Sequence, residues 1–263
     1  MMSDSETDKH KTIAQIKAQL DQITALDDPQ LVALYQDPRK GVQRYLTVTK
    51  HRLEMTIQAQ TQFEEHWLLE RMAWSKGRQH VVGIDEVGRG PLAGPVVTCA
   101  IELPTDFNLT AVNDSKQLSA ATREVLYPQI LAQCRQVSIG VASPQKIDEL
   151  NIYQATRVAM RDAVLSLAQT PDQLLIDAMQ IDVPIPQEKL IKGDARSVSI
   201  GAASIVAKVY RDHLMSLYDR VYPGYHFQQN DGYGTKAHLQ AIDDLGVTPI
   251  HRRSFSPVAK ALR

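Results

Sequence analysis

The chain has 263 residues, 43% of them hydrophobic, and a formal net charge of −1 at pH 7. This length and composition allow one large globular domain or a domain with an appendage. The charge excludes a general attraction to polyanions but leaves room for a local basic surface. The polar, acidic start lacks the apolar core of a signal peptide, and no later run is long enough to cross a bilayer, so we predict a soluble, cytoplasmic protein with no membrane partner. Cys99 and Cys134 lack metal-ligand spacing and are predicted to be buried thiols of a reducing compartment.

Helices are the first elements that the sequence predicts. Residues 12–76 carry apolar side chains at helical spacing and then a long stretch rich in Leu, Glu, Gln and Arg, with breaks at Asp37-Pro38 and Lys40-Gly41. Strand-like alternation begins only after this region. We therefore predict a helical N-terminal extension at residues 1–76 and a second domain at residues 77–263. A brace, a substrate grip and a partner-binding module all remain open as roles for the extension.

The second domain is predicted to contain five strands with helices between and after them. The strands are expected at residues 81–84, 95–103, 137–141, 174–177 and 188–191. The helices are expected at residues 119–133, 151–168, 195–218 and 235–245, before an irregular stretch at 251–257. A short glycine-rich link favours antiparallel pairing of the first two strands, whereas the later strand, helix, strand order is typical of a parallel crossover.

Acidic residues stand where the first predicted strand ends. Residues 83–95 read Gly-Ile-Asp-Glu-Val-Gly-Arg-Gly-Pro-Leu-Ala-Gly-Pro and place Asp85 and Glu86 between an apolar run and a glycine-rich turn. Side chains alternate along a strand, so these two acids can reach one ion together only if the strand ends or bends there. Gly88 and Gly90 supply the freedom to bend. The segment is therefore a candidate metal site with oxygen ligands.

Two further aspartates repeat this design. Asp177 ends a second buried apolar run, and Asp194 follows Ile-Lys-Gly just before a long helical pattern. If the strands that end at Asp85 and Asp177 are parallel neighbours, both side chains emerge at the sheet edge where open α/β proteins bind ligands. Clustered carboxylates require a shared proton or a bound cation, and an all-oxygen set suits Mg²⁺ or Mn²⁺ rather than zinc. Each acid alone would more simply cap a turn, but their repetition favours a catalytic role.

Five sequence blocks resemble the ribonuclease HII family. Besides residues 83–95, they are Asn-Asp-Ser-Lys-Gln-Leu-Ser at 113–119, Ala-Ala-Ser-Ile-Val-Ala-Lys-Val at 202–209, Gly-Tyr-Gly-Thr-Lys-Ala-His-Leu at 232–239 and His-Arg-Arg-Ser-Phe at 251–255. They follow the family order, so the resemblance does not depend on one short motif. It implies an α/β, ribonuclease H-like fold with a mixed five-stranded sheet flanked by helices. The helical N-terminal region resembles the extension of some members.

The resemblance also implies an activity and its cofactors. The family cleaves the RNA strand of RNA-DNA hybrids and incises 5′ to single ribonucleotides in duplex DNA, leaving a 5′ phosphate and a 3′ hydroxyl. Asp85, Glu86, Asp177 and Asp194 match its four acidic positions and would be both catalytic residues and metal ligands. Two Mg²⁺ or Mn²⁺ ions would bridge the scissile phosphate, one generating hydroxide and the other stabilising the leaving 3′ oxygen. A monomer is expected.

Contacts with the substrate are implied in the same way. Gly88, Arg89 and Gly90 match the family turn whose backbone contacts the 2′ hydroxyl, the group that marks RNA within DNA. Tyr233 matches a tyrosine that packs on the sugar at the RNA to DNA junction, although it could equally be a core aromatic. Phosphate contacts are implied for Lys116, Ser204 and Lys208. Without the resemblance, each lysine would be interpreted as a solvated surface charge.

The chain departs from the family pattern at two places. Asn230-Asp231 stand where many members carry a basic pair before Gly-Tyr, and the lost positive charge would weaken affinity or alter the preference for junctions. Gly201 stands where the family commonly has alanine or serine, which costs little beyond some helix propensity.

Three other interpretations remain open from the sequence. An NAD-type enzyme is possible because residues 88–93 fit a loose dinucleotide fingerprint, but Asp85 and Glu86 would then repel the pyrophosphate. A nucleic-acid binding module without catalysis would use the acids only as caps. A ribonuclease of the HIII type would cleave hybrids but handle single ribonucleotides poorly, and the Gly-Arg-Gly turn argues for type HII.

Overall fold

The structure is a computed structural model that describes residues 11–113 and 115–263. The acidic start of the chain and Asp114 of the predicted 113–119 block lie outside the described residues. The chain forms two compact units, Met1–Glu64 and Glu65–Arg263, and the division falls within helix α4 (Lys40–His66). The domain boundary that the sequence predicts after residue 76 lies further along the chain and stays a prediction.

The first unit is helical, as predicted. Helix α2 (Ile13–Gln22) begins at Thr12, whose side chain accepts a hydrogen bond from the Gln15 amide while the Gln15 side chain accepts one from the Thr12 amide. Helix α3 (Pro29–Ala33), the 3-10 turn η2 (Leu34–Gln36) and α4 follow. These elements share a core of Ile16, Leu20, Ile23, Leu31, Leu34, Val42, Leu46 and Leu53. The break at Asp37-Pro38 is confirmed, whereas the break at Lys40-Gly41 is wrong because these residues begin α4. The prediction of continuous helix before Asp37 is also wrong, because α2 ends well before Pro29 starts α3.

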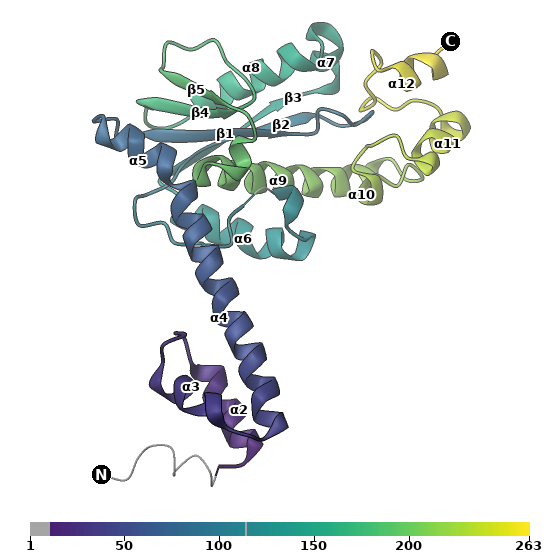
Figure 1. Cartoon of the computed structure of the whole chain (residues 1–263). Helices are drawn as coiled ribbons and strands as arrows, with labels where there is room; N and C mark the ends of the chain where they lie inside the picture. Colours follow the sequence, from purple (N-terminus) through teal and green to yellow (C-terminus); the bar gives the residue numbers. More distant parts are fainter. Residues whose placement is uncertain (1–10, 114) are drawn as a thin grey trace. The chain divides into compact units, whose positions relative to one another are not determined.

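A five-stranded mixed sheet forms the centre of the second unit (Figure 1), in the order β3-β2-β1-β4-β5. The strands are β1 (Val81–Val87), β2 (Val96–Glu102), β3 (Gln136–Ala142), β4 (Gln173–Asp177) and β5 (Gln187–Leu190). Strands β1, β2 and β3 pair antiparallel, whereas β4 is parallel to both β1 and β5. All five predicted strands and both predicted pairing modes are thus confirmed.

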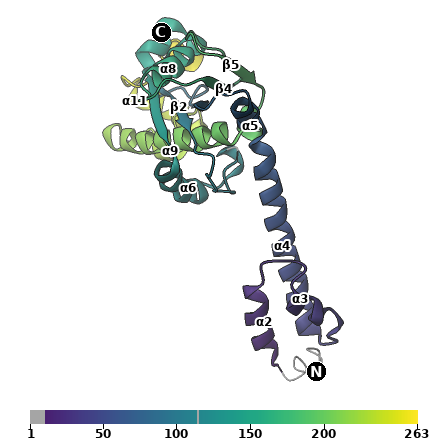
Figure 2. The same ribbon diagram turned by 90° about the vertical axis from the view of Figure 1, so that its left-hand side faces the viewer.

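Helices cover both faces of this sheet. In Figures 1 and 2, α8 (Ile152–Leu165) lies over one face, while α9 (Val198–Val221) crosses the other face and packs on α6 (Ala120–Gln133). Helix α5 (Leu68–Ser75) contacts β1. A Cβ on Gly83 would come within 2.3 Å of the Ser199 carbonyl carbon, so only glycine lets the start of α9 approach β1 this closely. This contact fixes α9 beside the strand that carries the first two acids.

The remaining short elements surround the ends of the sheet. They are η3 (Ser115–Gln117), α7 (Pro144–Leu150), η4 (Gly193–Ala195), α10 (Phe227–Asn230), α11 (Lys236–Leu245) and α12 (Ser256–Ala261). The sequence did not predict α7 or α12. The first begins with Ser143 as N-cap and Pro144 as its first residue, a helix-start pattern that was present but not used. Within the described ranges, no helix combines the length and apolar character needed to cross a membrane.

Candidate active site

Two of the predicted acids end neighbouring parallel strands. In the register of β1 and β4, Ile84 lies opposite Ile176, and Asp85 and Asp177 are the next residues along each strand. The strands themselves end differently, because β1 continues to Val87 and keeps pairing with β2. The predicted end of β1 at the acids is therefore wrong. Beyond the acids, β1 has a strand neighbour only on its β2 side, because β4 ends at Asp177.

Asp85 is the most deeply buried of the four acids, with 3% of its surface exposed. Its Oδ1 accepts a hydrogen bond from the Glu86 amide at 2.7 Å, and the Ser204 side chain on α9 is close enough to lower its pKa. Burial is the main reason that the pKa of Asp85 stands well above its ordinary value, and the negative charges of Glu86 and Asp177 raise it further. An added positive charge would therefore stabilise the ionised form of this carboxyl.

Glu86 lies in a similar environment with partial compensation. Burial and the charge of Asp177 raise its pKa, whereas Arg89 and Lys116 lower it. Arg89 Nη1 is 3.3 Å from Glu86 Oε1. The other oxygen, Oε2, is buried and has no hydrogen-bond partner. A buried carboxylate oxygen without a partner costs free energy unless a ligand satisfies it.

Asp177 and Asp194 are brought to the same end of the sheet by the turn after β5. The Gly193 amide donates to Asp177 Oδ1 at 2.7 Å. A Cβ on Gly193 would come within 2.7 Å of Ile200 Cδ1 and 3.2 Å of Asp177 Oδ1, which explains the glycine before the fourth acid. Asp194 is buried in η4, and its Oδ2 lies 3.1 Å from Lys116 Nζ.

The arrangement of these acids can be tested for its fit to a divalent cation. The donors are all carboxylate oxygens, and Glu86 and Asp177 are close enough to Asp85 for their charges to raise its pKa. As placed, however, no group of three or more His, Cys, Asp or Glu side chains among the described residues could hold a metal ion. Two of the acids face the cationic side chains of Arg89 and Lys116. The unpartnered Glu86 Oε2 and the oxygen donor set fit a hard cation that would replace these contacts.

The glycine-rich turn after β1 is held by two buried arginines that the sequence analysis did not identify as functional. Arg252 donates to the carbonyl oxygens of Gly88 at 2.5 Å, Arg89 at 2.9 Å and Gly94 at 2.9 Å. Gly88 has φ +88°, and a Cβ there would come within 2.2 Å of Arg211 Nε. The conformation and the packing therefore both require glycine at this position.

Arg211 fixes the far end of the same loop. Its guanidinium donates to Pro95 O at 3.0 Å, Ala93 O at 3.2 Å and Asp231 O at 2.9 Å. Burial lowers the pKa of Arg211, and burial together with Arg211 lowers that of Arg252 to about 9. Backbone carbonyls thus replace water around both cations. Arg252 lies in the 251–255 block, so the sequence analysis identified its segment but not its role in holding the turn.

The remaining predicted contact residues lie on α9 and in the loops beside it. Ser204 and Ser115 share a hydrogen bond of 2.7 Å between their hydroxyls, and Lys208 lies one helical turn after Ser204. Tyr233 is 49% exposed, so it is not a core aromatic. A Cβ on Gly90 would come within 3.3 Å of Tyr233 Cε1, which places the ring directly beside the turn.

A fifth acid, Glu70 on α5, supports the site from outside it and was not predicted. It is 1% exposed, and its Oε1 accepts hydrogen bonds from Ser197 Oγ at 2.6 Å, Ser199 Oγ at 2.6 Å and Ser199 N at 3.1 Å. Burial raises its pKa. These bonds anchor the first turn of α9, which directly follows the turn that carries Asp194.

Fold and site together define a nuclease of the ribonuclease H-like class. The family model for ribonuclease HII matches residues 82–258, and the model for the ribonuclease HII N-terminal domain matches residues 12–74. The chain is 59% identical over 255 residues to the ribonuclease HII of Levilactobacillus brevis, covering 97% of this chain and 99% of that one. The chain therefore belongs to the ribonuclease HII family, and it is a ribonuclease H, a hydrolase and endonuclease.

Solved structures show the same fold at low sequence identity. The ribonuclease H2 from Pyrococcus horikoshii OT3 superimposes with a TM-score of 0.61 at 24% identity, covering 70% of this chain and 97% of that one. Bst-RNase HIII, solved in complex with Mn²⁺, gives a TM-score of 0.57 at 20% identity over 70% of this chain and 69% of its own. The predicted ribonuclease H-like α/β fold is confirmed.

Proposed function

We propose that this enzyme cleaves the RNA strand of RNA-DNA hybrids and incises duplex DNA on the 5′ side of single embedded ribonucleotides, leaving 5′ phosphate and 3′ hydroxyl ends. The observation that carries the proposal is the acidic edge of the sheet. There Asp85 is buried beside Glu86 and Asp177, and Glu86 Oε2 has no hydrogen-bond partner. The mutual repulsion of these carboxylates destabilises the site until bound cations neutralise it.

The cofactors we propose are two Mg²⁺ or Mn²⁺ ions held by Asp85, Glu86, Asp177 and Asp194. When bound, such ions activate water as the nucleophile and stabilise the charge on the leaving 3′ oxygen. Glu86 offers Oε2 directly, while its Oε1 would exchange the contact with Arg89 for a cation. The Glu86 amide keeps Asp85 oriented, and the Gly193 amide does the same for Asp177. The protein contributes fixed carboxylates whose charge the cations neutralise.

Recognition of the ribonucleotide is assigned to the turn formed by Gly88, Arg89 and Gly90. Arg252 already uses the carbonyls of the first two residues and fixes the turn, so its geometry is set before substrate arrives. Gly90 has no side chain to block a sugar, and the exposed ring of Tyr233 lies beside it. Backbone groups in a rigid turn can distinguish a 2′ hydroxyl from hydrogen because the hydroxyl both donates and accepts.

The nucleic acid backbone would be positioned by Lys116, Ser204 and Lys208. Lys116 is largely exposed, with its Nζ at Asp194, so it reaches both solvent and the acidic site. Ser204 and Lys208 lie one turn apart on α9, spaced to follow a phosphate backbone. All proposed residues come from one chain, and we propose that the monomer acts on its substrate without a second copy.

The NAD-type interpretation fails on topology. The turn after β1 leads directly into antiparallel β2, so no helix N-terminus follows the glycines to bind a pyrophosphate. The HIII-type alternative differs in how single ribonucleotides are handled. The Arg252-held Gly-Arg-Gly turn favours incision at single sites, because one fixed contact to one 2′ hydroxyl suffices for recognition there.

The test compares three labelled duplexes that differ only in sugar. They are an RNA-DNA hybrid, a DNA duplex with one ribonucleotide, and the same duplex made entirely of DNA, each with Mg²⁺, Mn²⁺ or chelator. We expect metal-dependent cutting of the first two, with no cutting of the third. Cutting of the hybrid alone would support the HIII-type alternative, and cutting of the all-DNA duplex would overturn the proposed specificity.

A further inference from the structure

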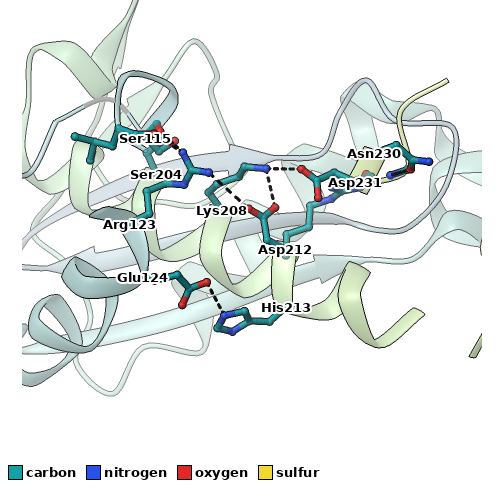
Figure 3. Close-up of polar contacts among 12 residues, drawn as sticks. Ser115, Arg123, Glu124, Ser204, Lys208, Asp212, His213, Asn230 and Asp231 are labelled. Carbon is teal, nitrogen blue, oxygen red and sulfur yellow. Dashed lines mark hydrogen bonds and ion pairs between the residues drawn. The ribbon is translucent and has the colours of Figure 1, made fainter. Parts of the chain in front are cut away.

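The ammonium of Lys208 lies between two carboxylates (Figure 3). Its Nζ is 2.7 Å from Asp212 Oδ1 and 2.8 Å from Asp231 Oδ2. The three side chains are 20%, 26% and 27% exposed, so the cluster is open to a ligand from solvent. Two carboxylates thus share the single Lys208 ammonium. A lysine with two carboxylate partners is a poor first contact for a phosphate.

The two carboxylates are held differently. Asp212 is on α9 four residues after Lys208, and its Oδ2 also lies 3.9 Å from Arg123 Nη2. Arg123 in turn donates to Ser115 O at 2.9 Å and Leu118 O at 2.6 Å, which fixes it against the η3 loop. Asp212 is therefore shared between two cations as part of the helix surface (Figure 3).

Asp231 reaches Lys208 from the loop that leads to Tyr233. Its backbone is left-handed, with φ +50°, and Arg211 Nη1 donates to its carbonyl oxygen at 2.9 Å. The preceding Asn230 is buried and bonds both Tyr225 O and Gly232 N, each at 2.8 Å. The backbone on both sides of Asp231 is thus fixed, so its carboxylate cannot simply move away with a flexible loop.

The two carboxylates also repel each other. Burial is the main cause that raises the pKa of Asp212, and the charge of Asp231 adds to it, while Lys208 and Arg123 act in the opposite direction. Lys208 therefore balances a repulsive pair. A phosphate that approached Lys208 would meet the same repulsion from Asp231.

We propose that Asp231 lowers the affinity of this enzyme for nucleic acid by competing with a substrate phosphate for Lys208. The proposal rests on the proposed function, in which Lys208 contacts the backbone. A phosphate takes over the Lys208 ammonium only when it displaces the Asp231 carboxylate, so each binding event exchanges one ion pair for another. Asp231 thereby sets how tightly the duplex is held next to Tyr233 and how readily it is released.

The experiment measures binding of a labelled DNA duplex with one ribonucleotide in chelator, at several salt concentrations. The informative variant is Asp231→Asn, because asparagine tolerates the left-handed backbone and keeps the size of the side chain. Asp231→Asn is compared with Lys208→Met and with the double variant. The matched control is Asp162→Asn, which removes one exposed negative charge on α8 that pairs with Arg161.

Asp231→Asn is expected to tighten binding about twofold to fivefold, the range of a partly exposed ion pair. The plot of log affinity against log salt should steepen by up to about 0.9, since Lys208 then neutralises a phosphate and releases one counterion of the DNA without freeing a carboxylate. In the Lys208→Met background the substitution should have a clearly smaller effect, because only the direct repulsion between Asp231 and the phosphate is then removed. Unchanged or weaker binding by Asp231→Asn, an equal gain in the Lys208→Met background, or an equal gain from Asp162→Asn would each overturn the proposal.

Failure of the proposed function has a different signature. Incision of the same duplex with Mn²⁺ is measured in parallel with wild-type enzyme. Absence of incision overturns the proposed function. Incision by the wild type together with no change in the affinity of Asp231→Asn overturns only the role of Asp231.

Discussion

Asp85→Asn should raise the stability of the second unit in chelator although it abolishes activity. The side chain is buried, and the negative charges of Glu86 and Asp177 act on it, so its ionised form is destabilising when no cation is present. Asparagine is nearly isosteric and keeps the acceptor for the Glu86 amide. Removal of this buried negative charge should raise the free energy of unfolding by about 1–2 kcal/mol in chelator. For a unit of this size the melting temperature should rise by about 2–8 °C.

The pH dependence of this difference follows from the direction of the pKa shift. The folded-state pKa of Asp85 is raised above its ordinary value of 3.8, so the protonated form contributes stability that is fully present below pH 3.8. That contribution is lost as pH rises through the folded-state pKa. Asp85→Asn should therefore differ least from wild type in acid and should gain its advantage as pH rises.

Divalent metal should reverse the order of stability. A ligand at about 100 times its dissociation constant stabilises a folded protein by about 2.7 kcal/mol, and Asp85→Asn forfeits much of this because it loses a ligand. Denaturant unfolding of both proteins with chelator and with Mn²⁺ measures the crossover. A variant that is less stable than wild type in chelator, or that is stabilised equally by Mn²⁺, would refute the assignment of Asp85 as a charged metal ligand.

Two further substitutions test the positioning of the site. Arg89→Ala removes the side chain that we expect to orient the Gly88-Arg89-Gly90 turn, so incision at a single ribonucleotide should fall by about tenfold, a loss of about 1.4 kcal/mol of transition-state stabilisation, with little change in duplex affinity. Equal losses in incision and affinity would contradict a role in orientation. Glu70→Ala removes the acceptor shared by the Ser197 and Ser199 hydroxyls and the Ser199 amide, so that the two hydroxyls keep no acceptor but each other, and should lower the free energy of unfolding by about 2–3 kcal/mol, measured by denaturant titration. Glu70→Gln keeps an acceptor oxygen and should recover most of that loss, whereas equal destabilisation by both would exclude the hydrogen bonds as the cause.

The centre of the sheet was predictable because β1, β2 and β4 contain buried apolar runs. The runs before Asp85 and Asp177 have the same pattern, and neighbouring parallel strands place their ends at one edge. The strand end expected at Asp85 and Glu86 was wrong because pairing with β2 continues through Val87. Whether a strand ends depends on both neighbours, and the sequence of one strand does not reveal when its partner on either side stops.

The supporting charges were not predictable from their own segments. Arg211 lies in a helix and is buried only because the carbonyls of Ala93, Pro95 and Asp231 surround its guanidinium. Glu70 is similarly buried by serines far along the chain. A charged side chain normally indicates an exposed face, and these exceptions depend on tertiary partners that local patterns do not contain.

Incision of two duplexes that differ at a single 2′ position tests the proposed chemistry most directly. One duplex carries one ribonucleotide and the other has the corresponding deoxyribonucleotide, and each is treated with wild type or Asp85→Asn in saturating Mn²⁺. Wild-type enzyme should cut only the first duplex, on the 5′ side of the ribonucleotide, and Asp85→Asn should cut neither. Turnover by Asp85→Asn at the wild-type rate, or cutting by the wild type that ignores the 2′ hydroxyl, would contradict the assigned roles of the acids and the turn.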